Sequence, residues 1–176
     1  MDAMPSSLLS RALIAHIKEQ FLLDWRGIHG APHWTRVLAN GRRLAKHTGA
    51  NLNVVELFSF LHDSQRQNEG TDPEHGQRAA QWINSLNGRF FTLDDEESQL
   101  LQTACRDHTK GYTQGDITVC TCWDADRLDL GRVGIKPDPA YLCTDIARDK
   151  ATIEWSFARS IQNHRSKTDG RSGKIN

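Results

Sequence analysis

Cysteine, net charge and long apolar runs are all scarce in this sequence of 176 residues. Four cysteines (Cys105, Cys120, Cys122 and Cys143) are too few for a disulfide scaffold, and we expect packed, reduced thiols in a cytoplasmic protein. Basic and acidic residues number 22 each, so no overall positive field would recruit nucleic acid. No apolar run approaches the roughly 18 residues of a membrane-spanning helix, so we expect no membrane partner.

Helical periodicity dominates the chain and predicts an all-α class. Residues 118–123 are rich in the β-branched residues that favour strands, but we prefer a helix because no partner strand is visible. We expect a single-domain helical bundle of about six to eight helices over residues 1–165, with a flexible polar tail at 166–176. The expected helices are 7–25, 32–46, 53–65, one opened by Asp72 and Pro73, 94–107, 118–130 and 150–163.

The third of these helices ends in two polar side chains. Residues 54–61 are apolar on nearly every side, which is typical of a buried central helix. The run leads directly into His62 and Asp63. Burying an imidazole beside a carboxylate is costly unless each group has a partner. A bound cation is one such partner, and a hydrogen-bonded structural pair is the alternative.

Two further residues stand in a recognisable order around this pair. His33 opens a helix in the segment PHWTRV, and Asp126 lies in WDADRLD. With these contexts the order His, His-Asp, Asp resembles the HD superfamily of metal-dependent phosphohydrolases, over about residues 25–135. The resemblance implies an HD-type helical fold and a divalent metal ion held by His33, His62, Asp63 and Asp126.

Mixed nitrogen and oxygen ligands of this kind accept several metals, and we expect Mn, Fe, Co, Ni, Mg or Zn. Such an ion lowers the pKa of bound water and polarises a phosphoryl group. The chemistry therefore requires no protein nucleophile, and the sequence has neither a G-x-S-x-G motif nor a P-loop lysine.

The number of metal ions depends on two more histidines, His75 in DPEHGQRAA and His108 in CRDHTKG. Members of the superfamily that hold two metals add two histidines in this interval, and Asp63 would then bridge the ions. The alternative is an exposed histidine near a helix start and one satisfied by the dipole at a helix end. We favour two ions.

Positive side chains near these residues are candidates for contact with a substrate phosphate. The residues after Asp63 are SQRQN, without the acidic residues of one-metal members. Arg66 occupies the place of a lysine in two-metal cyclic-dinucleotide phosphodiesterases, which implies a catalytic and phosphate-binding role beside Asp63. A surface salt bridge with Glu69 or Asp72 is its alternative. Lys110 is a second phosphate-binding candidate or a solvated lysine.

Three other expectations concern the surroundings of the site. We expect Arg127 to pair with an acid that fixes the helix of Asp126. His29 could reach the mouth of the pocket from its loop, and the five tryptophans are expected in the core or pocket wall.

The function expected from these residues is hydrolysis of a small phosphomonoester or phosphodiester, such as a nucleotide, by metal-activated water. One alternative is a di-iron oxygenase, which would share all six ligands. The other is a non-catalytic binding module in which the metal ion only stabilises the fold. The sequence leaves the oligomeric state open.

Overall fold

The computed structural model describes residues 7–168, with side chains as far as residue 161. Helices and loops make up this range, which contains no β-strand beyond one isolated bridge between Asn87 and Phe91. The expected all-α class is confirmed. The elements are α1 Arg11–Gln20, α2 Ala31–Thr48, α3 Leu52–Leu61, α4 His75–Leu86, α5 Asp95–Asp107, α6 Ile117–Arg127, η1 Leu130–Val133, η2 Pro139–Tyr141, α7 Asp145–Arg148 and α8 Lys150–Thr168.

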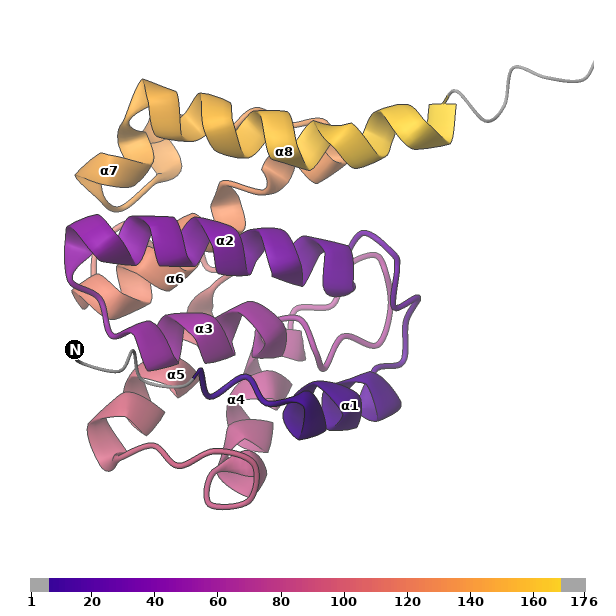
Figure 1. The fold of residues 1–176 in the computed structure, drawn as a ribbon, viewed down its shortest axis with the longest axis vertical. Helices are drawn as coiled ribbons and strands as arrows, with labels where there is room; N and C mark the ends of the chain where they lie inside the picture. Colours follow the sequence, from indigo (N-terminus) through magenta and orange to yellow (C-terminus); the bar gives the residue numbers. More distant parts are fainter. Residues whose placement is uncertain (1–6, 169–176) are drawn as a thin grey trace, which may run out of the picture.

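Helices α2, α3 and α6 form the centre of the bundle. Helix α2 packs against both α3 and α6, and α5 packs against α3, α4 and α6. In Figure 1 α8 lies above α2, while α4 and α5 lie on the far side of α3. Of the predicted tail at 166–176, residues 166–168 belong to α8 and the rest lies outside the described residues.

Local sequence signals explain the ends of α2 and α3. Pro32 lies in the first turn of α2, and Gly49 ends that helix with a left-handed φ of 72°. The Asn51 side chain caps α3 by accepting a hydrogen bond from the Val54 amide. As predicted, every residue from 54 to 61 is buried. The helix ends at Leu61 rather than near 65. Beyond that residue the backbone forms turns, in which the Ser64 and Arg66 amides donate to carbonyls three residues earlier.

Two other helix starts differ from the prediction. Asp72 does not cap α4, which begins at His75; its carboxylate instead accepts hydrogen bonds from the Gln67 amide and Arg78. Helix α1 begins at Arg11 because Ser10 caps it, not at residue 7. The predicted helix at 94–107 is confirmed, and its Asp94 is the cap. The prediction of a helix rather than a strand at 118–130 is also confirmed, although α6 ends at Arg127.

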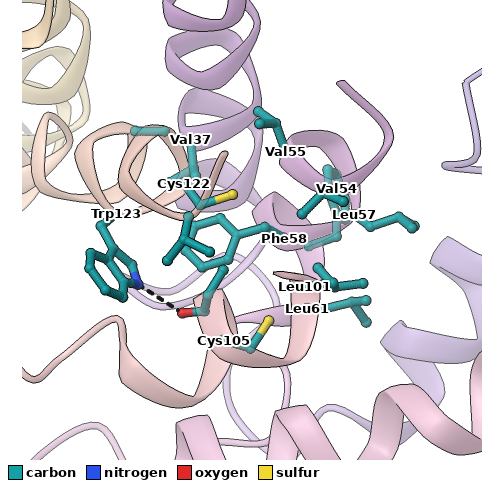
Figure 2. Packing of buried hydrophobic residues seen from close by; sticks show 14 of the residues in the cluster. Val37, Val54, Val55, Leu57, Phe58, Leu61, Leu101, Cys105, Cys122 and Trp123 are labelled. Atoms are coloured by element: carbon teal, nitrogen blue, oxygen red, sulfur yellow. Dashed lines mark hydrogen bonds between the residues drawn. The ribbon is translucent and has the colours of Figure 1, made fainter. Parts of the chain in front are cut away.

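One part of the hydrophobic core lies where α3, α5 and α6 meet. Figure 2 shows Phe58 among the side chains of these helices, with Cys122 and Trp123 on one side and Cys105 nearby. The Trp123 indole donates to the Ala104 carbonyl at 3.1 Å, which ties α6 to α5. All four cysteines are free, and burial raises the pKa of the Cys105 and Cys122 thiols. Within residues 7–168, no helix has the length and apolar character needed to cross a membrane.

Candidate metal centre

Three helices bring the first four predicted ligands together. His33 lies in the first turn of α2, His62 caps the end of α3, and Asp126 lies in the last turn of α6. The His33 Nε2 atom is 3.1 Å from His62 Nε2 and 3.3 Å from Asp126 Oδ1. Oδ2 of Asp63 lies 3.7 Å from each of these two histidine nitrogens. We call these donors the first set.

The second set of donors consists of Asp63 Oδ1 and the Nε2 atoms of His75 and His108. His75 begins α4 and His108 caps the end of α5. Their Nε2 atoms lie 3.0 Å and 3.4 Å from Asp63 Oδ1, and 3.0 Å from one another. Both side chains are buried, so the interpretation of His75 as an exposed histidine is wrong. All six predicted ligands therefore meet around Asp63.

The outer nitrogen of each imidazole is held by an acceptor. Nδ1 of His62 lies 3.1 Å from the Phe58 carbonyl, and Nδ1 of His108 lies 2.7 Å from the Cys105 carbonyl. His75 Nδ1 contacts the Asp72 carbonyl in the same way. Because a carbonyl oxygen only accepts, Nδ1 carries the proton in these three rings and Nε2 presents a lone pair.

Lone pairs that converge in a buried space require a positive partner. Burial lowers the pKa of His62 to about 3, so this imidazole is neutral near pH 7. Burial opposes ionisation of Asp63, but the surrounding imidazoles hold the pKa of its carboxyl well below the ordinary range, and the contact with Asp63 raises the pKa of His108. The cluster thus combines imidazole nitrogens with carboxylate oxygens, which is the donor chemistry of a transition-metal site.

The spacing of the donors also fits a metal ion. Ligands about 2.1 Å from one ion lie about 3.0 Å apart at right angles and about 3.4 Å apart in a tetrahedron. The separations within the two sets run from 3.0 to 3.7 Å. His33, His62 and Asp126 converge in this way, as do His62, Asp63 and His108. The arrangement is compatible with divalent metal binding.

A glycine allows the second set to form. Gly76 follows His75 at the start of α4, where a Cβ atom would lie 2.5 Å from the Cys105 carbonyl oxygen. Any side chain there would push α4 away from the end of α5. The glycine therefore permits the close approach that places His75 beside His108.

Asp129 supports the first set, and the sequence analysis missed this role. Its Oδ2 lies 2.7 Å from His33 Nδ1, and its carboxylate accepts hydrogen bonds from Arg36 Nε at 2.6 Å and Nη2 at 3.0 Å. Asp129 follows Asp126 by three residues, close to one helical turn. That spacing in WDADRLD was the available signal.

The two predicted phosphate-binding residues lie in different surroundings. Arg66 is buried, with Nη1 3.6 Å from Asp63 Oδ1. The alternative of a surface salt bridge is wrong, because Arg78 pairs with Asp72 and His29 pairs with Glu69. Lys110 is exposed, and its part in phosphate binding stays a prediction.

The predicted pairing of Arg127 with an acid is wrong. Arg127 Nη1 donates to the Tyr141 carbonyl at 2.9 Å rather than to an acid. The buried Asp124 carboxylate accepts the Cys143 and Thr144 amides instead, which fixes the segment before α7 to α6. The ring of His29 joins the loop before α2 to the loop after α3 through Glu69, and burial lowers its pKa.

The cluster is most open to solvent at Asp126. Its side chain is 15% exposed, whereas the side chains of His33 and His62 are fully buried.

Comparison with known proteins identifies the class of fold. No family profile matches the chain, and no curated protein matches it. Among solved structures, a predicted HD superfamily hydrolase from an uncultured Thermotogales bacterium is similar, with a TM-score of 0.65. The two chains are 21% identical, and the match covers 91% of each. The resemblance to the HD superfamily is thus confirmed at the level of the fold, and the histidine–aspartate cluster fits an HD-type metal site.

Proposed function

We propose that this chain is a metal-dependent phosphohydrolase that cleaves a small phosphomonoester or phosphodiester, such as a nucleotide. One divalent ion would be held by His33, His62 and Asp126, and a second by His75 and His108. Asp63 would bridge the two ions. The observation that carries the proposal is the position of Asp63, because its two carboxylate oxygens face different sets of imidazole nitrogens.

Divalent ions at these two sets supply an activated water and a Lewis acid for the phosphoryl oxygens. The chain's own residues hold and orient this chemistry. Asp63 keeps its carboxylate ionised between the two sets, and Asp129 fixes the ring of His33. Arg66 adds positive charge beside Asp63, where a phosphate would need it.

The hydrolase class has support from the similar protein, which is itself described as a predicted HD superfamily hydrolase. At 21% identity this likeness concerns the fold, so the reaction rests on the site. Mn, Fe, Co, Ni, Mg and Zn all suit these nitrogen and oxygen donors.

Elemental analysis of protein purified without added metal, followed by a phosphoester panel, tests the proposal. The chelator-treated protein should be inactive, and Mn, Co, Ni or Mg should restore hydrolysis of at least one phosphoester. A His33→Ala variant purified in parallel should stay inactive with every metal, which excludes a contaminating phosphatase. Coupled iron with oxygen consumption, and no phosphoester turnover, would instead identify an oxygenase.

A further inference from the structure

The side chain of Arg66 lies directly against the second set of donors. Its Nη1 donates a hydrogen bond to His75 Nε2 at 3.4 Å and lies 3.6 Å from Asp63 Oδ1. The lone pair on His75 Nε2 is the one that a metal ion in the second set would use. The guanidinium thus competes with an ion for one ligand and repels its charge.

The first set has a different electrical environment. The arginines near it, Arg36 and Arg132, are directed to Asp129, which lies behind the ring of His33. Arg36 donates to that carboxylate through both Nε and Nη2. The repulsion from Arg66 therefore falls mainly on the second set, and the two sets should differ in affinity for the same metal.

Arg66 itself is incompletely satisfied. Its Nη2 donates to the Gly70 carbonyl at 2.7 Å, but its buried Nε has no acceptor among the described residues. A buried guanidinium with an unpaired N–H group favours an additional acceptor. An anion with several oxygens, such as a phosphate group, could accept from Arg66 and offset its charge.

We propose that Arg66 makes binding of the second metal ion depend on an anionic ligand, the phosphate group of the substrate. This inference rests on the proposed two-ion site. Without the anion, the second set binds its ion weakly because the guanidinium lies beside it. With the anion accepting from Arg66, its negative charge offsets the repulsion, so ion and phosphate bind together.

Titration of the chelator-treated protein with Mn²⁺, followed by calorimetry and electron paramagnetic resonance, tests this coupling. The parent should bind one ion tightly and the second about tenfold or more weakly, and inorganic phosphate should tighten only the second by about tenfold. In Arg66→Gln the second ion should bind about tenfold more tightly without phosphate, and most of the phosphate effect should disappear.

Arg106→Gln is the matched control, because Arg106 precedes His108 by two residues but its side chain contacts Asp107 and Thr103. It should behave as the parent does. Two ions bound with equal affinity in the parent, or a phosphate effect unchanged in Arg66→Gln, would overturn the inference. The parent alone provides the first of these tests if Arg66→Gln fails to fold. Failure of the parent to bind any Mn²⁺ would instead contradict the proposed function.

Discussion

His33 and Asp129 lie 96 residues apart in the sequence, yet His33 Nδ1 is 2.7 Å from Asp129 Oδ2. The carboxylate fixes the ring so that Nε2 faces the cluster, and it also pairs with the buried Arg36. Such outer contacts orient a ligand and raise its basicity. Asp129 therefore joins the packing of α2 to the geometry of the first set.

Asp129→Ala should weaken both metal binding and stability. The released ring of His33 should lower the affinity of the first set for Mn²⁺ about 10- to 100-fold. The unpaired charge of Arg36 should cost about 3 kcal/mol of unfolding free energy. Calorimetry and denaturant unfolding measure the two effects. Asp145→Ala, which removes a fully exposed carboxylate, should change neither, and an unchanged metal affinity in Asp129→Ala would contradict the positioning role.

Gly76→Ala should damage the second set selectively. The added methyl group would meet the Cys105 and Arg106 carbonyl oxygens at 2.5 and 2.9 Å, so α4 must move away from α5. We expect a loss of about 2 kcal/mol in unfolding free energy and loss of the second ion, while the first ion still binds. Mn²⁺ stoichiometry measures this, and two bound ions in the variant would refute it.

The control for that substitution is Gly115→Ala. A Cβ atom at Gly115 would have its nearest neighbour at 3.7 Å, an ordinary contact distance. The variant should therefore keep both ions and the stability of the parent.

Asp72 should contribute a pH-dependent part of the stability. Burial opposes its ionisation, but hydrogen bonds from Arg78 hold its pKa below the ordinary value of 3.8. Because the pKa is lower in the folded chain, the contribution is complete above about pH 4 and is lost as pH falls below that value. The Asp72→Asn variant should be about 1 kcal/mol less stable than the parent at pH 7.

Unfolding curves of the parent and Asp72→Asn between pH 3 and 7 check this sign. The two proteins should converge in stability as the pH falls below about 4, where the parent carboxylate takes up its proton. A constant difference over the whole range would show that the pair contributes no charge-dependent stability.

The helices and the six-residue cluster could be predicted because both depend on local or ordered signals. Helical periodicity and helix-end residues such as Pro32 and Gly49 act within a few positions, and the order His, His-Asp, Asp can be read from one sequence. The partners of Asp129 and Arg127 could not be predicted in this way. Their contacts cross between segments distant in the chain, so the fold must be known first.

Asp72 illustrates the same limit at short range. An aspartate before a proline is a common helix cap, but here its carboxylate binds Gln67 and Arg78. Its carbonyl meanwhile contacts His75 Nδ1, so the residue helps to place a ligand. The tertiary contact with Arg78 outweighs the local preference.

The metal content and phosphoester turnover of Asp63→Ala, measured beside the parent, test the central claim most directly. Asp63 is the one residue whose carboxylate faces both sets of histidines in the described range. The variant should purify without bound metal and lose turnover about 10³-fold or more. A metal-free Asp63→Ala protein that hydrolyses phosphoesters as fast as the parent would contradict the claim.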